Sequence, residues 1–176
     1  MYQIENCSWR EAGYAVGFEL TWYLLTHSLS TYPEKVVIKE NVSALFDEFI
    51  NKIKNSRTFQ ETINTFLCKK NNSFSQDTVG VVSFPLLPSL DLYLSLHDCT
   101  VWVEGEKNDD GTWNLQVLMV DIYNFDYKDL EKLKSLGEKL SWAINNIAYS
   151  SQEVGAITPF DVEIRFTMEN YKIKRE

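Results

Sequence analysis

The stretch CTVWVEGEKNDDGTWNLQVLMVDIYNF, residues 99–125, decides the fold that this sequence predicts. Two largely apolar segments flank the sequence Asn108-Asp109-Asp110-Gly111. An Asp-Gly pair favours a tight hairpin turn, because glycine accepts a positive φ that other residues avoid. We therefore predict two strands joined as a β-hairpin.

The second strand of this hairpin has an unusual end. Its odd-numbered side chains are apolar for four positions, and the next two on that side are Asp121 and Tyr123. Because alternate residues of a strand share one face, Asp121 should emerge at the rim of the core face. An unpaired buried carboxylate is costly, so Asp121 needs backbone N–H groups, a cation, a metal ion or water as its partner. The structural alternatives are that Asp121 caps the following turn and that Tyr123 buries one flank of its ring.

The rest of the chain predicts an α+β fold in a single domain, residues 1–176. Apolar residues recur at helical spacing in the first half, and the short segment after two prolines favours a helix over a strand. The segment 160–168 alternates cleanly and predicts a strand with one wet face, whereas the polar segment 69–80 predicts a loop. We expect a helical first half, then the hairpin, a long helix and a final strand, forming a small antiparallel sheet packed by helices. The predicted helices cover residues 9–29, 43–55, 58–69, 89–97 and 129–150.

Composition excludes several classes of protein. The formal net charge of −8 argues against nucleic acid as a partner and against docking on anionic membranes, because both need a cationic face. No apolar run is long enough for a transmembrane segment, and no classical signal peptide is visible. The expected location is cytoplasmic, or secreted by a route that needs no such signal. Cys7, Cys68 and Cys99 form no CxxC pair, which favours reduced structural thiols.

The two histidines are the next candidates for chemistry. His27 continues the apolar stripe of Leu20 and Leu24, and His97 directly precedes Asp98. A histidine beside a carboxylate can perform general acid–base catalysis, although each is also typical of a hydrogen-bonded structural residue. Asp126 is expected to cap the helix that follows. Alternatively, Asp126 provides a second oxygen ligand, beside Asp121, for an ion such as calcium. No cofactor is evident from the sequence. A divalent cation bound by these carboxylates is the one cofactor that the sequence leaves possible.

At VDIYNFD, residues 120–126, the chain resembles secreted bacterial toxin domains, including the colicin M-type bacteriocins, which carry an Asp-x-Tyr-Asp element on a strand. Asp121 and Tyr123 match this element, Asn124 replaces its second Asp, and Asp126 is the candidate to compensate. The segment YKDLEKL occupies the place of the family's His-Arg pair. More broadly, residues 20–168 resemble C-terminal toxin domains of Gram-positive polymorphic toxin systems. The resemblance implies cleavage of a lipid-linked cell-wall precursor, and a cognate immunity protein as partner.

Three hypotheses about function follow. In the first, the chain is an antibacterial, toxin-like hydrolase. Asp121 is then the acid, base or ion ligand, His97 or His27 transfers the proton, and Tyr123 orients a phosphate or other polar group. In the second, it is a non-catalytic immunity, accessory or phage inhibitor protein, whose acidic surface steers it onto a basic partner. In the third, it is a structural or metabolic domain.

Overall fold

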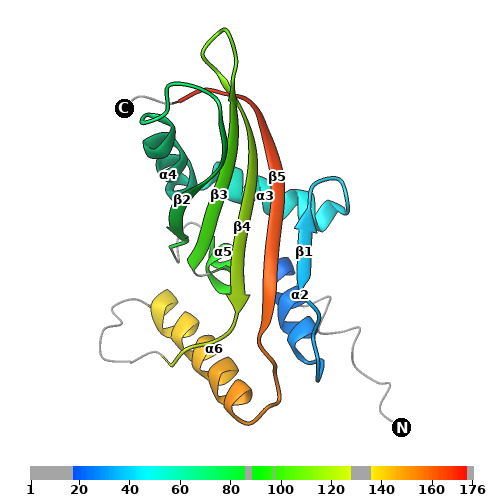
Figure 1. Cartoon of the computed structure of the whole chain (residues 1–176). Coiled ribbons are helices and arrows are strands. Elements are labelled where there is room, and N and C mark those ends of the chain that lie inside the picture. Colours follow the sequence, from blue (N-terminus) through cyan, green and yellow to red (C-terminus); the bar gives the residue numbers. More distant parts are fainter. Residues whose placement is uncertain (1–17, 86–88, 97, 128–135, 174–176) are drawn as a thin grey trace. The chain divides into compact units, whose positions relative to one another are not determined.

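The computed structural model describes residues 18–85, 89–96, 98–127 and 136–173, with the backbone alone for residues 136–138, 140 and 141 (Figure 1). The described residues divide into two compact units, each assembled from three separate parts of the chain. Counting the described residues, we call 35–84, 96, 98–122 and 161–173 the sheet unit, and 18–34, 85, 89–95, 123–127 and 136–160 the helical unit. The α+β class is confirmed. The prediction of a single domain stays a prediction.

A five-stranded sheet with the order β1-β5-β4-β3-β2 organises the sheet unit. The predicted hairpin is confirmed, because β3 and β4 pair antiparallel from Thr100 opposite Val120 to Lys107 opposite Trp113. Gly111 has a φ of 82°, the conformation for which its lack of a side chain suits it. The final strand is also confirmed and lies beside β4. The bounds are β1 Val36–Lys39, β2 Phe74–Ser83, β3 Asp98–Lys107, β4 Trp113–Tyr123 and β5 Phe160–Tyr171.

Two features of the sheet differ from the prediction. The sheet is mixed rather than wholly antiparallel, since β1 pairs parallel with β5 and sets Val36 opposite Val162. Residues 74–83 form the edge strand β2 rather than part of a loop. Most side chains of β2 are polar and at least partly exposed, and register shifts interrupt its pairing with β3. An edge strand of this kind needs only one neighbour, so it carries no clear hydrophobic alternation.

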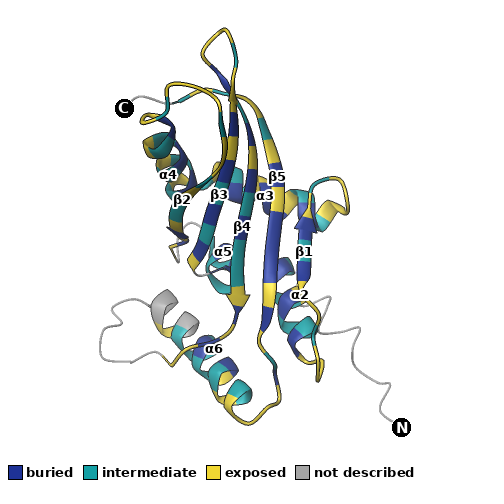
Figure 2. Ribbon diagram, in the orientation of Figure 1, coloured by how far each residue is buried: buried dark blue, intermediate teal, exposed yellow. Residues whose placement is uncertain are grey.

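Two helices, α3 Ala44–Asn55 and α4 Arg57–Leu67, pack against this sheet and confirm two predicted helices. Ser43 caps α3 by accepting a hydrogen bond from the N–H of Phe46 at 3.2 Å. The ring of Phe59 meets that of Phe166 on β5, with centroids 5.7 Å apart. The core face of β4 is buried as its alternation predicts (Figure 2), and consists of Trp113, Leu115, Val117 and Met119.

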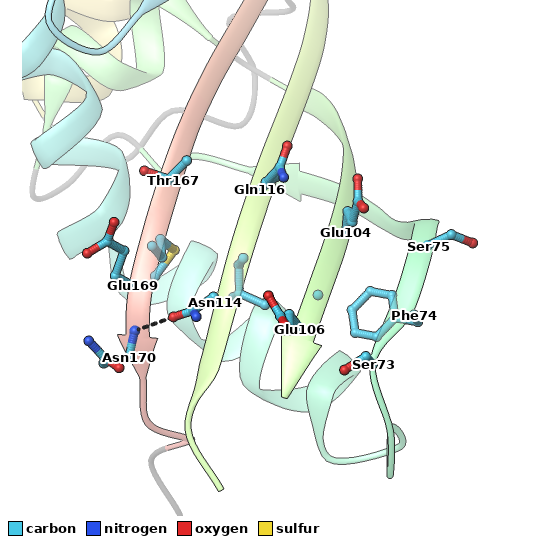
Figure 3. Close-up of a pocket in the computed structure, with 13 residues that line it drawn as sticks. Ser73, Phe74, Ser75, Glu104, Glu106, Asn114, Gln116, Thr167, Glu169 and Asn170 are labelled. Atoms are coloured by element: carbon cyan, nitrogen blue, oxygen red, sulfur yellow. Dashed lines mark hydrogen bonds between the residues drawn. The ribbon is translucent and has the colours of Figure 1, made fainter. Parts of the chain in front are cut away.

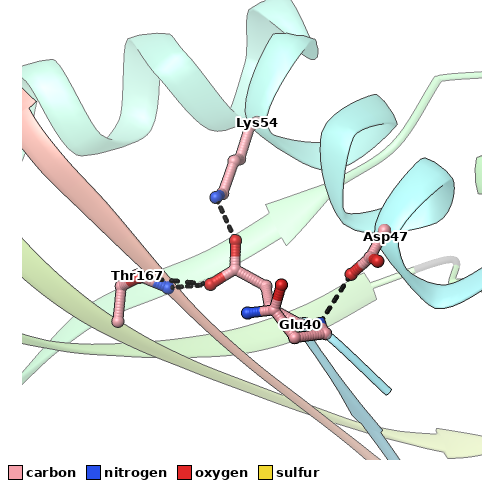
Figure 4. A network of polar contacts seen from close by, with 5 residues as sticks. Glu40, Asp47, Lys54 and Thr167 are labelled. Carbon is pink, nitrogen blue, oxygen red and sulfur yellow. Dashed lines mark hydrogen bonds and ion pairs between the residues drawn. The ribbon is translucent and has the colours of Figure 1, made fainter. Parts of the chain in front are cut away.

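Glu40 ties the end of β1 to this core (Figure 4). Its carboxylate accepts hydrogen bonds from the Lys54 ammonium, and from the backbone N–H and the hydroxyl of Thr167 at 2.7 and 3.2 Å. Desolvation raises the pKa of Glu40, but Lys54 and Thr167 outweigh it and hold that pKa below its ordinary value. The next residue, Asn41, donates its N–H to Asp47 of α3 at 2.7 Å. One carboxylate therefore joins β1, α3 and β5.

Gly105 on β3 is a position where a larger residue should be costly. A methyl group there would overlap the ring of Phe74, which packs against Phe66 and Trp113 with centroid distances of 5.4 and 5.6 Å. Gly105→Ala is therefore expected to lower the free energy of unfolding by about 1–3 kcal/mol, measured by urea denaturation. In a Phe74→Ala background the same substitution should cost less than about 0.5 kcal/mol. An equal cost in both backgrounds would contradict this explanation.

The helical unit contains α2 Glu19–Ser28, α5 Leu90–Ser95 and α6 Leu136–Glu153. α2 and α5 pack together, and the N–H of Thr158 donates to the carbonyl of Ser28 at 2.7 Å. Within the described parts of the predicted helices 9–29, 89–97 and 129–150, residues 19–28, 90–95 and 136–150 are helical. Residues 9–17, 97 and 129–135 lie outside the described residues. Among the residues that the structure describes, no helix is long and apolar enough to span a membrane.

Candidate functional site

Asp121 lies near the end of β4, where its carboxylate is half-buried. One oxygen accepts the backbone N–H of Ile122 at 2.8 Å, and the other lies 3.8 Å from the sulfur of Cys99. Desolvation first, and the negative charge of Asp121 second, raise the pKa of Cys99 well above its ordinary value. The thiol therefore stays protonated and donates to the carboxylate. The partners of Asp121 thus include a thiol as well as a predicted backbone N–H.

Tyr123 is buried in the helical unit. Its ring packs against Phe125 and Phe160, with centroid distances of 5.1 and 5.2 Å. Its hydroxyl is buried and finds no hydrogen-bond partner in the described part of the chain. Desolvation and the charge of Asp91 both raise the pKa of Tyr123. The phenol therefore stays protonated and keeps its capacity to donate a hydrogen bond.

Asp91 is a buried carboxylate that the sequence analysis did not propose as a site residue. It lies on α5, is only 4 % exposed, and accepts hydrogen bonds from the N–H and the hydroxyl of Thr21 at 2.9 and 2.8 Å. The Thr21 hydroxyl also lies 3.0 Å from that of Ser95. The available signal was a single carboxylate within the apolar segment LDLYLSL.

His27 and Tyr123 both contact the ring of Phe160. The Nε2 atom of His27 lies 2.8 Å from the carbonyl oxygen of Glu34, which makes Nε2 the protonated donor. The His27 ring also meets Phe160 edge-on at 4.7 Å, and Phe160 is the ring that Tyr123 contacts. His97 lies outside the described residues. The proton-transfer role of either histidine stays a prediction.

Asp126 has an exposed side chain, but its backbone is held by α6. Asn145 donates its side-chain amide to the carbonyl of Asp126 at 2.7 Å. The Gln152 amide pairs with both the N–H and the carbonyl of Phe125, at 3.1 and 3.3 Å. These two amides, which the sequence analysis missed, fix the segment that follows Tyr123. In the described ranges no three His, Cys, Asp or Glu side chains gather as metal ligands, and the divalent cation stays a prediction.

The sheet unit also carries a large hollow over four neighbouring strands (Figure 3). Its volume is about 730 Å³, and carboxylates, amides and hydroxyls dominate its lining. A second hollow of about 510 Å³ shares three of its side chains, Glu104, Gln116 and Thr167. We call the two hollows together the outer trough. They are suited to binding a polar ligand, whereas Asp121 and Tyr123 line neither of them.

The buried phenol predicts a dependence of stability on alkaline pH. A raised pKa in the folded state means that the unfolded chain ionises first, so stability is present below about pH 10 and is lost above it. Each such group contributes a slope of about 1.4 kcal/mol per pH unit. Tyr123→Phe should remove one such slope in urea denaturation series between about pH 9 and about pH 12. Tyr32→Phe, at an 88 % exposed position, should leave the slope unchanged, and equal slopes in Tyr123→Phe and the unsubstituted chain would contradict the assignment.

Comparison with known proteins gives limited similarity. No family model matches the chain, and no curated protein matches it. Among solved structures, that of pectocin M2 aligns with 98 % of this chain and 64 % of its own, at a TM-score of 0.34 and 18 % sequence identity. The aligned region thus spans less than two thirds of the pectocin M2 chain. Similarity at this level carries no conclusion about activity or site residues.

Proposed function

We propose that this protein is a toxin-like effector, a hydrolase that acts on a phosphate-containing substrate at the end of β4. The Asp-x-Tyr element formed by Asp121 and Tyr123 motivates the proposal, because it resembles that of colicin M-type toxins. A lipid-linked cell-wall precursor is the substrate that this resemblance favours.

The observation that carries the proposal is the buried hydroxyl of Tyr123, which has no hydrogen-bond partner among the described residues. Such a group costs about 1–3 kcal/mol of stability, and native proteins contain few of them. A catalytic or binding role is one reason for which proteins retain such a group. The raised pKa keeps the phenol protonated, so that it can donate to a substrate oxygen. The missing hydrogen bond would then form only with the substrate.

The roles of the neighbouring residues follow from their chemistry. Asp121 is the residue that we expect to act as acid, base or ion ligand, with the thiol of Cys99 on one of its oxygens. Burial first, and the negative charge of Asp91 second, raise the pKa of Tyr123 and keep it protonated. Asn145 and Gln152 are positioning residues, because they hold the backbone that follows Tyr123. His27 supplies an imidazole against the ring of Phe160, which Tyr123 also contacts.

Expression in bacteria tests the proposal. We expect the chain to arrest growth when an added signal sequence exports it across the inner membrane, and the purified protein to release the head group of a lipid-linked cell-wall precursor in the presence of magnesium or calcium. The readouts are viable counts and chromatography of the released product. The proposal is contradicted if the chain arrests growth neither in the cytoplasm nor after export, and if the purified protein cleaves no precursor. That outcome would favour the non-catalytic binding protein.

A further inference from the structure

The outer trough occupies the face of the sheet opposite the core. Glu104 and Glu106 of β3, Gln116 of β4, and Thr167 and Glu169 of β5 are exposed there. The hairpin register sets Glu104 opposite Gln116 and Glu106 opposite Asn114, so these carboxylates face amides rather than cations (Figure 3). The polar side chains come from neighbouring strands of one sheet, so backbone hydrogen bonds fix the spacing of the residues that carry them.

The larger hollow is negatively charged. Its lining includes Glu104, Glu106 and Glu169 and, over the described residues, no lysine or arginine. None of the three glutamates has an ion-pair partner within the part of the chain that the structure describes. Lys107, the next residue after Glu106, instead donates to the carbonyl of Asn71 at 3.0 Å and lies over the Trp113 ring. The three carboxylates thus remain available to a cationic ligand.

The smaller hollow adds an apolar contact surface. Trp102 and Leu118 line it, are opposite each other in the β3–β4 register, and are half-buried. Its basic side chains are Arg165, which is paired with Glu163, and Lys39 at the end of β1. The outer trough crosses the width of four strands, about 14 Å at the usual strand spacing, which is the length of about four extended residues. Its dimensions and lining therefore match a short stretch of extended polypeptide.

We propose that the outer trough binds an extended basic segment of a partner protein. Lysine or arginine side chains of this segment pair with Glu104, Glu106 and Glu169, and its apolar side chains contact Trp102 and Leu118. Charge complementarity identifies the partner, because the hollow is acidic and the chain as a whole carries a net charge of −8. A small polyamine would leave the apolar end of the outer trough uncovered. The inference is independent of the hydrolase proposal, since the site at the end of β4 shares no residue with the outer trough.

Stability distinguishes this role from a structural one. Three carboxylates that line one hollow without cations repel each other, so they stabilise the fold little or not at all. Replacing all three by glutamine should leave the midpoint of urea denaturation unchanged or slightly higher. A clear fall in the midpoint would show that the carboxylates serve the fold, and would overturn the proposal.

Binding is tested with a short synthetic peptide that alternates lysine with leucine or tryptophan, against the same peptide with glutamate for lysine. We expect the lysine peptide to bind at an ionic strength of about 0.15 M and to shift NMR signals of outer-trough residues. The triple variant Glu104→Gln, Glu106→Gln, Glu169→Gln should bind it about tenfold more weakly. The matched control Glu34→Gln, Glu48→Gln, Glu153→Gln removes the same charge at exposed positions outside the outer trough and should change binding by less than about twofold.

Four results would overturn the proposal. The first is absence of binding by the lysine peptide. The second is an equal loss of binding in the two triple variants, which would indicate only the diffuse field of the whole protein. The third is spermidine binding as tightly as the peptide, which would identify a small polyamine as the ligand. The fourth is self-association of the unliganded chain that the outer-trough variant abolishes, which would make a second copy the occupant.

Discussion

Asp121→Asn is expected to lower the rate of substrate hydrolysis by about 100-fold or more and to restore the viability of cells that export the protein. The substitution keeps the shape and the oxygen that accepts from the N–H of Ile122, and it loses only the long contact between the second oxygen and the Cys99 thiol. It removes the group that can take or give a proton or hold a cation. The melting temperature should therefore stay close to that of the unsubstituted chain. Hydrolysis of the precursor and viable counts are the two measurements.

Two controls make this result specific. Asp161→Asn removes an exposed carboxylate from β5 and should retain full activity. Tyr123→Phe should lose activity without losing stability, because the deleted hydroxyl has no hydrogen-bond partner among the described residues. Full hydrolysis by the Asp121→Asn protein would remove the basis of the catalytic proposal. Full hydrolysis by Tyr123→Phe would exclude the role of the phenol and remove the structural observation that carries the proposal.

Asp91→Ala is expected to lower the free energy of unfolding by about 3 kcal/mol. Thr21 is the third residue of α2, so its N–H belongs to the first turn, where no helical carbonyl is available. Phe18 at the N-cap position provides no side-chain cap, and the carboxylate of Asp91 accepts this N–H from a different segment. A negative charge is also favourable at the N-terminus of a helix. The truncation removes the acceptor and the charge together.

Asp91→Asn separates these two contributions. It retains an oxygen for Thr21 and should cost about half as much or less, measured as the midpoint of urea denaturation at neutral pH. It should also move the pKa of Tyr123 back towards its ordinary value, because a negative charge is lost. Asp126→Ala, at an exposed position of the same unit, should change stability by less than about 0.5 kcal/mol. A loss in Asp91→Asn as large as in Asp91→Ala would contradict the capping role.

Local sequence signals predict much of this fold. The hairpin follows from Asp110-Gly111 and from alternation on either side, and α3 and α4 follow from apolar periodicity. β2 was missed because a polar edge strand lacks alternation. β1 was missed because four residues contain too little pattern, and its pairing with β5 joins segments far apart in the sequence. A strand of four residues with a distant partner leaves too little local signal to be predicted.

Part of the candidate site was also predictable from the sequence. The position of Asp121 and Tyr123 on the core-facing side of β4 was predictable from strand alternation alone. The contact between Asp121 and Cys99 was also predictable, because the register that sets Thr100 opposite Val120 brings Cys99 opposite Asp121. The capping of α2 by Asp91 was not predictable, because it depends on how α2 and α5 pack together. Periodicity shows which face of a helix is buried, but not which polar group meets its first turn.

The parallel pairing of β1 with β5 sets the order in which the protein can fold during translation. β1 emerges early from the ribosome, yet its neighbour is made only when residues 160–171 have been synthesised. Until then, one edge of β4 and the whole of β1 lack their strand partners. Unpaired edges of this kind recruit strands from other nascent chains, so interrupted synthesis should yield aggregates rather than a smaller folded protein.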